Sequence, residues 1–334
     1  MFATPLPPLD GHFENDQIAH SAYQRTLRLE NQNVVWIRIL GYMLIYAPHE
    51  NGRLEIARDI HSCATDQDVL ELGCSIFMYF VQYFKLVDTC TPGPPSPPSS
   101  DPLQGQTSNL IFATPATYSE AKANALVRDN YRCMLTGKVD THTYTYSPRL
   151  REQLGNSPPP DVDDTECWHI IPHCAPNCIH DSEKKQTTCA ATFNLLERFG
   201  NINHLQLSQG GPHHWTNVMT VQLGLRQNFN LLHIWLDPVE GMEDTYAIGR
   251  RYPGLRPDLP QAITFTTSNP ALPLPDRRYL ALHAACARVA HLSGATETIG
   301  SISNEMEHRG VLSEDGSSAV LLEHFLSVHS ARVA

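Results

Sequence analysis

The chain has 334 residues, of which 41% are hydrophobic, so it is long enough to bury a substantial core. Its length suggests two domains, or one domain with helical extensions. Its net charge is 24 − 35 = −11. An acidic surface repels phosphate, which excludes a broad basic face for nucleic acid. Any contacts with DNA would be local or would depend on a partner.

Cysteine usage and the first residues of the chain indicate where the protein resides. There are nine cysteines and no Cys-x-x-Cys pair, and residues 1–8 are proline-rich without a charged and apolar leader. We therefore expect free thiols and an intracellular location, cytoplasmic or nuclear. The longest apolar runs, 34–46 and 69–87, are interrupted by charged residues, so no membrane span is expected.

Residues 13–90 are predicted to form a helical unit that follows a flexible segment, 1–12, and precedes a proline-rich linker, 91–110. Thr65 and Asp68 have the spacing of a helix N-cap and its partner. The unit would be a packing domain or would bind a protein partner. Within it we expect a turn at Asn51-Gly52 and helices at 15–29, 34–46, 54–60 and from Thr65 onward.

The second domain is predicted to span residues 111–245, and a C-terminal helical extension is predicted to span 246–334. Residues 140–164 are rich in Pro, Thr and Asp and predict an inserted loop. The expected elements are a helix at 119–130 capped by Ser119 or Thr117, a turn at Gly137, a β-type run from 165, a helix at 188–199, strands at 231–237 and 263–265, a helix at 276–293 ended by Gly294, and a helical pattern at 313–330.

Four local motifs occur in a fixed order in this domain. Cys133 begins a Cys-x-x-Thr-Gly turn, His169 begins His-Ile-Ile-Pro, Asn217 lies in Thr-Asn-Val-Met-Thr, and Phe229 ends a short helical pattern. Together they resemble the fungal branch of the HNH nuclease domain family, over about residues 119–243. The resemblance implies a ββα-metal fold and an endonuclease that hydrolyses DNA phosphodiester bonds.

The resemblance also implies a role for each matched residue. His169 would be the general base that deprotonates water, and Asn217 would orient the histidine loop. A divalent metal, Mg²⁺ or Mn²⁺, would stabilise the charge that develops on phosphate. Cys133 would be structural, and Phe229 would pack under the site.

The chain departs from the family pattern at two metal-ligand positions. Arg226 stands nine residues after Asn217, where the family has histidine, and Trp168 precedes His169, where many members have an acidic residue. Neither side chain can ligate a cation. Arg226 could instead clamp phosphate in a bidentate way. Replacement ligands could come from Glu166, His213, His214 and His233, with Asp163 and Asp164 upstream.

Two further interpretations compete with these assignments. Taken alone, His169 could be a hydrogen-bonded core histidine, and Asn217 could be a helix cap. His173, Cys174, Cys178 and His180 suggest a zinc site, but the polar, proline-broken loop around them favours free thiols, so structural zinc is not expected.

The sequence therefore predicts an α+β protein: a helical N-terminal unit, an HNH-like ββα module with long insertions, and C-terminal helices. The leading functional prediction is a metal-dependent endonuclease that uses His169, Asn217 and Arg226 on DNA. The alternative, favoured by the acidic charge and the two substituted positions, is a catalytically degenerate HNH scaffold that acts as an interaction protein.

Overall fold

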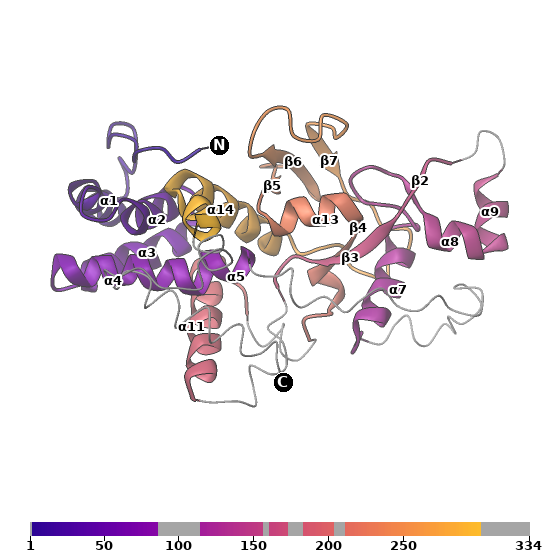
Figure 1. Ribbon diagram of the computed structural model, residues 1–334, viewed down its shortest axis with the longest axis horizontal. Coiled ribbons are helices and arrows are strands. Elements are labelled where there is room, and N and C mark those ends of the chain that lie inside the picture. The colour runs from indigo at the N-terminus through magenta and orange to yellow at the C-terminus, as the bar shows by residue number, and fades with distance from the viewer. Residues whose placement is uncertain (1, 86–113, 156–159, 173–182, 204–210, 302–334) are drawn as a thin grey trace. The chain divides into compact units, whose positions relative to one another are not determined.

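Over its described residues, the protein combines helices with three small sheets, so its fold class is α+β (Figure 1). The computed structural model describes residues 2–85, 114–155, 160–172, 183–203 and 211–301. The chain forms two compact units. One comprises Met1–Phe84, Cys174–Asn201 and Ala285–Ala334, and the other comprises Lys85–His173 and Ile202–Ala284. We refer to them as the helical unit and the hairpin unit.

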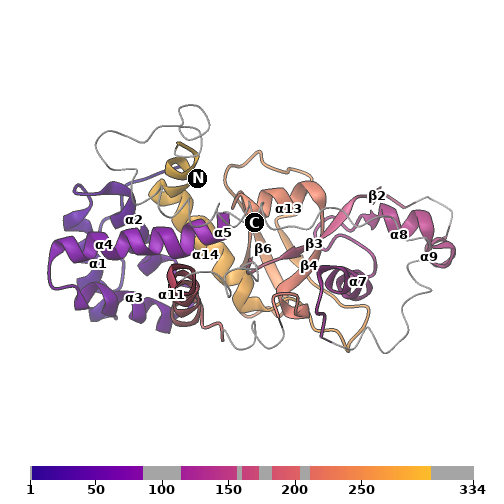
Figure 2. The same cartoon turned by 60° about the horizontal axis from the view of Figure 1, so that its bottom comes forward.

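The helical unit is a cluster of helices that pack against one another (Figure 2), and they bury many of their apolar side chains. The predicted N-terminal helices are confirmed, and α3 and α11 pack against each other. Arg198 of α11 joins them through ion pairs with Glu55 and Asp59 of α3. The elements are α1 Gln17–Leu29, α2 Val34–Ile45, α3 Glu50–Ser62, α4 Asp66–Ile76, a π-helical turn Phe77–Val81, α5 Gln82–Lys85 and α11 Glu183–Gly200.

Local sequence signals explain how the helices of this unit start. Thr65 caps α4, and Asp68 completes the predicted capping box by accepting a hydrogen bond from the Thr65 backbone N–H. The turn expected at Asn51-Gly52 is wrong, because both residues lie inside α3. Gly52 is needed there for close packing: a Cβ would meet the carbonyl oxygen of Phe199 at 2.4 Å.

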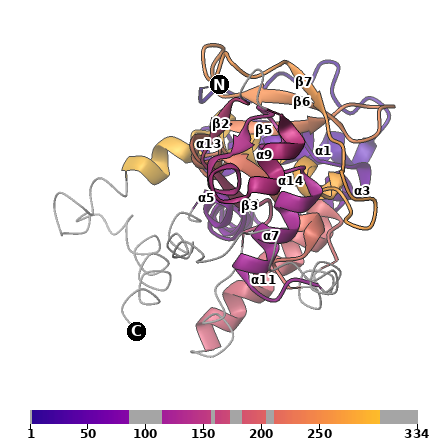
Figure 3. The same cartoon turned by 90° about the vertical axis from the view of Figure 1, so that its right-hand side faces the viewer.

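The hairpin unit is organised around two antiparallel strands, β3 Thr165–His169 and β4 Val218–Gln222. Helix α13, Leu223–Asn230, follows β4 without an intervening loop. Helix α7, Tyr118–Arg128, also packs on the hairpin (Figure 3). Of the two predicted caps of α7, the structure selects Thr117, whose hydroxyl accepts a hydrogen bond from Glu120 N. The hairpin is thus followed directly by a helix.

Residues 140–164 contain regular structure where a loop was expected. The segment holds two short parallel strands and two short helices: β1 Val139–Asp140, α8 Thr141–Tyr146, α9 Pro148–Leu154 and β2 Val162–Asp163. Asp140 organises it. One carboxylate oxygen caps α8 through Thr143 N at 2.7 Å, and the other accepts a hydrogen bond from the Thr165 hydroxyl at 2.6 Å. The insertion is therefore anchored directly to the start of β3.

A three-stranded antiparallel sheet completes the hairpin unit, in the order β5 Ile234–Pro238, β6 Thr245–Arg250 and β7 Ala262–Thr264. The sequence predicted β5 and β7 but not β6, so the part of 246–334 described here is not purely helical. Gly249 of β6 faces the indole of Trp235, which a Cβ would meet at 2.0 Å. Helix α14, Arg277–Ser293, ends at Gly294 with φ +85° as predicted.

Several predicted segments lie outside the described residues. They are the linker 91–110 and the helical pattern 313–330. Across the described ranges, the helices are too short or too polar to cross a membrane.

A buried ion pair at the end of α7 ties the hairpin unit together. Arg128 and Asp129 have side chains that are 1% and 0% exposed, and they bond each other directly. The Arg128 guanidinium also donates to the carbonyl oxygens of Trp215, Val218 and Pro273. Asp129 accepts a hydrogen bond from the backbone N–H of Thr220. One pair thus links α7, β4, the turn before β4 and the segment before α14.

We expect Arg128→Met to destabilise the hairpin unit by about 3 kcal/mol or more, because it leaves the Asp129 carboxylate buried without its cation. Denaturant unfolding followed by tryptophan fluorescence would measure the loss. The control is Arg149→Met on the exposed surface of α9, which should change stability little. Equal effects of the two substitutions would contradict this account of Arg128.

Candidate functional site

Alternation along β3 sends neighbouring side chains to opposite faces of the hairpin. Cys167 packs with Ala121 and Ala125 of α7, whereas Trp168 packs on Phe229 of α13. The two faces therefore carry different groups. His169 shares the α7 side with Cys167, and Glu166 shares the α13 side with Trp168.

The Asn217 side chain joins the segment that follows β3 to the segment that precedes β4. It is fully buried in the 3₁₀ turn Trp215–Asn217. Its side-chain oxygen accepts a hydrogen bond from Ile171 N at 2.8 Å, and its nitrogen donates to Ile171 O at 3.0 Å and Pro212 O at 2.9 Å. The backbone N–H of Ile170 also donates to Asn217 O at 2.9 Å, so Asn217 bonds two consecutive residues after β3. This geometry suits a residue that orients the histidine loop.

His169 lies at the end of β3 beside a second histidine. Its Nε2 is 2.9 Å from Nδ1 of His213, and the two rings meet edge to face. One of these nitrogens must donate a proton and the other must accept it, so at least one of the two imidazoles carries a lone pair toward its neighbour. The ring of Tyr118 stacks on His169 with centroids 6.0 Å apart. His169 is thus held from two sides.

Arg226 is paired with Glu166 on the other face of the hairpin. The Arg226 Nη1 contacts Glu166 Oε2, and the side chains are only 12% and 26% exposed. A phosphate clamp would need a guanidinium that is available to a ligand, whereas this one already has a carboxylate partner. The Arg226 guanidinium also neutralises the charge of the Glu166 carboxylate.

Trp168 fills the space between β3 and α13. Its indole stacks on Phe229 with centroids 4.3 Å apart and meets His283 edge to face at 5.1 Å. The indole N–H donates to Asn230 Oδ1 at 2.9 Å. With 3% of its surface exposed, Trp168 acts as a core residue at a position where the resemblance expects a metal ligand.

The other proposed metal ligands have separate partners. His214 Nδ1 is 2.8 Å from the Thr216 hydroxyl, and burial lowers the pKa of the imidazole. His233 Nε2 is 3.2 Å from Arg251, and burial, followed by the Arg251 charge, lowers the His233 pKa. Glu166, His213, His214 and His233 thus do not converge. Within the described ranges, no three His, Cys, Asp or Glu side chains are grouped to hold a metal ion.

The upstream acid Asp163 has partners of its own. Asp163 accepts hydrogen bonds from Lys138 Nζ at 3.1 Å and Gln222 Nε2 at 2.6 Å, away from His169. The residues around His169 therefore do not fit the metal that the resemblance implies. The candidate zinc residues His173, Cys174, Cys178 and His180 lie outside the described residues.

Cys133 has a structural place in the turn that follows α7. It is 1% exposed, and its sulfur accepts a hydrogen bond from Gln222 N at 3.3 Å. Gly137 closes the turn with φ +71° and donates its N–H to Cys133 O. The turn is thereby fastened to the end of β4.

Sequence reasoning missed the residues that support the site from α7. Lys122 Nζ donates to Thr165 O at 3.1 Å, and a backbone hydrogen bond with Cys167 engages Tyr118. Burial raises the pKa of Tyr118 to about 12. Tyr118 and Lys122 stand four residues apart, so both lie on one helix face. That spacing, together with the adjacent charged residues Arg128 and Asp129, was the sequence signal that could have pointed to α7.

Comparison with known proteins gives no relative for this chain. No family model matches it, and no curated protein or solved structure matches it either.

We expect the stability of the hairpin unit to fall in mild acid because His283 must stay neutral. His283 is buried on α14 with Nε2 3.1 Å from Phe229 O, and burial lowers its pKa to about 4. The folded pKa is depressed, so this stability is present above about 6.5 and is lost as pH falls. From the two pKa values, the loss is about 2 kcal/mol at pH 5.

Unfolding at pH 7.5 and pH 5, followed by tryptophan fluorescence, measures this loss. His283→Gln keeps a donor for Phe229 O but does not titrate, so its stability should fall about 2 kcal/mol less than that of the wild type. The same loss in both proteins would show that His283 does not carry the pH dependence.

Proposed function

We propose that the hairpin unit is an HNH-type ββα module that acts as an interaction scaffold without metal-dependent nuclease activity. The proposal rests on the order of the motifs, on the strand–strand–helix arrangement of β3, β4 and α13, and on the orienting geometry of Asn217. The same proposal includes a protein partner that binds the helical unit.

A single observation carries the loss of metal chemistry. Where the resemblance expects two metal ligands, this chain has Arg226, paired with Glu166, and Trp168, packed on Phe229. A guanidinium already provides the positive charge that a cation would bring to Glu166. Adding a divalent ion beside it would require breaking a pair that is more than two-thirds buried, which is costly.

The second candidate is an active endonuclease, and the pairing of His169 with His213 favours it. A neutral His169 could still accept a proton from water, and His213 could orient it through the 2.9 Å contact. Orientation and proton transfer alone leave the developing charge on phosphate without a stabilising cation, which is usually a major part of catalysis. The scaffold function therefore agrees better with the residues present.

Plasmid nicking by the full-length protein with Mg²⁺ or Mn²⁺ tests the choice. We expect no nicking above that of His169→Ala with either metal, because the metal position is taken by the ion pair. The matched control is His142→Ala, which changes a histidine of α8 outside the site. Metal-dependent nicking that His169→Ala abolishes and His142→Ala preserves would establish the endonuclease.

A further inference from the structure

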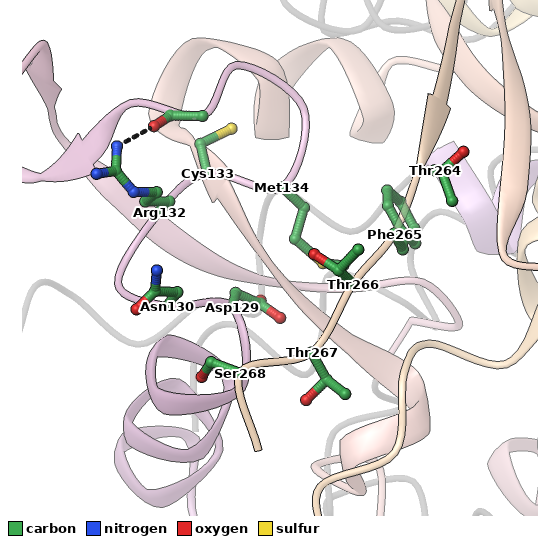
Figure 4. Close-up of a pocket in the computed structure, with 11 residues that line it drawn as sticks. Asp129, Asn130, Arg132, Cys133, Met134, Thr264, Phe265, Thr266, Thr267 and Ser268 are labelled. Atoms are coloured by element: carbon green, nitrogen blue, oxygen red, sulfur yellow. Dashed lines mark hydrogen bonds between the residues drawn. The ribbon is translucent and has the colours of Figure 1, made fainter. Parts of the chain in front are cut away.

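The hairpin unit contains a surface cavity of about 380 Å³ that is separate from the His169 site (Figure 4). One wall is the turn that follows α7, from Asp129 to Gly137. The other wall is the extended segment that leaves β7, from Thr264 to Ser268. The two walls come from segments more than a hundred residues apart in sequence, and Figure 4 shows them on facing sides of the opening.

Both walls carry hydrogen-bond donors that have no protein partner among the described residues. On the turn, Arg132 donates one Nη1–H to Gly137 O at 2.8 Å, and its remaining guanidinium N–H groups are unpaired within the described residues. The side-chain amide of Asn130 likewise has no protein partner there. On the opposite wall, the same holds for the hydroxyl of Thr266 and for the backbone N–H groups of Thr266 and Thr267.

The acidic group in the cavity lining does not offset these donors. Asp129 is the one acid among the described lining residues, and its carboxylate is buried. It accepts hydrogen bonds from Arg128 and from Thr220 N, and Arg128 neutralises its charge. Arg132 therefore gives the cavity a formal charge of about +1, on a chain whose net charge is −11.

Backbone conformation supports a built site at this place. Asn130 and Tyr131 are consecutive non-glycine residues with φ of 56° and 58°. Left-handed backbone in a residue as bulky as tyrosine is unfavourable, and such strain concentrates at ligand sites. The strain is held by two hydrogen bonds, from Tyr131 N to Leu126 O and from Asp140 N to Tyr131 O. The turn is thereby fixed with Asn130 and Arg132 beside the cavity.

We propose that this cavity binds a small molecule through its phosphate group. Guanidinium, amide, hydroxyl and backbone N–H donors are the groups that recognise phosphate oxygens. A tetrahedral phosphate has terminal oxygens in several directions and can accept from both walls, whereas a planar carboxylate presents two oxygens in one plane. The cavity exceeds one phosphate in volume and has room for the rest of a phosphate ester. The site is independent of the function proposed for His169.

Isothermal titration of the full-length protein with inorganic phosphate and, separately, with adenosine 5′-monophosphate tests the proposal. The variants are Arg132→Gln and Asn130→Asp. The first removes the cation, and the second places a carboxylate beside the phosphate while keeping a residue type that tolerates left-handed backbone. Arg149→Gln, an exposed arginine of α9, is the matched control for net charge. Circular dichroism checks that each variant folds.

We expect saturable binding to the wild type and to Arg149→Gln, and binding weaker by about tenfold or more in both cavity variants. Tighter binding of the nucleotide than of inorganic phosphate would identify a phosphate ester as the ligand, and equal binding would identify phosphate alone. No saturable binding of either probe to the wild type would overturn the proposal. So would cavity variants that fold and bind as tightly as the wild type.

Discussion

The hairpin unit depends on the buried pair of Arg128 and Asp129. Two adjacent residues at the end of α7 reach three other backbone segments: Asp129 bonds Thr220 N on β4, and Arg128 donates to carbonyls in the turn before β4, on β4 and before α14. A buried guanidinium is expensive unless its donors are satisfied, and here a carboxylate and three carbonyls satisfy them. The network also holds the turn that contains Asn217, because Arg128 bonds Trp215, which begins the turn, and Val218, which follows it.

A second ion pair determines what the site can do. Arg226 and Glu166 neutralise each other on the α13 face of the hairpin, while Trp168 fills the neighbouring space as a core residue. His169 and Asn217 lie in an arrangement that suits proton transfer, and among the described residues no three His, Cys, Asp or Glu side chains are grouped to hold a metal ion. Under the proposed function, packing and an internal salt bridge occupy the positions where the resemblance expects metal ligands.

Local signals accounted for much of the fold. Helix caps such as Thr65 and Thr117, the glycine stop at Gly294 and the apolar periods of the N-terminal helices are set by neighbouring residues, so the sequence alone predicts them. Gly52 shows the opposite case. Asn-Gly is a strong turn signal, yet Gly52 lies inside a helix, where the lack of a Cβ leaves room for the distant carbonyl of Phe199.

The candidate site could be predicted only in part, for the same reason. The motif order located His169 and Asn217, and the structure places them on adjoining segments joined through Ile171. The partner of Arg226 lies sixty positions away in sequence, at Glu166, and no local pattern reveals that contact. The proposed metal ligands likewise contact residues that are distant in sequence, as His233 contacts Arg251.

The most direct test of the proposal that the Arg226–Glu166 pair stands in place of a metal is a calorimetric titration of the wild-type protein and of Glu166→Gln with Mn²⁺. If the Arg226–Glu166 pair replaces the metal, the two proteins will give the same titration, because Glu166 takes no part in binding a cation. Stoichiometric binding of Mn²⁺ that is lost in Glu166→Gln would contradict the account, because it would show that Glu166 exchanges its guanidinium partner for a metal ion.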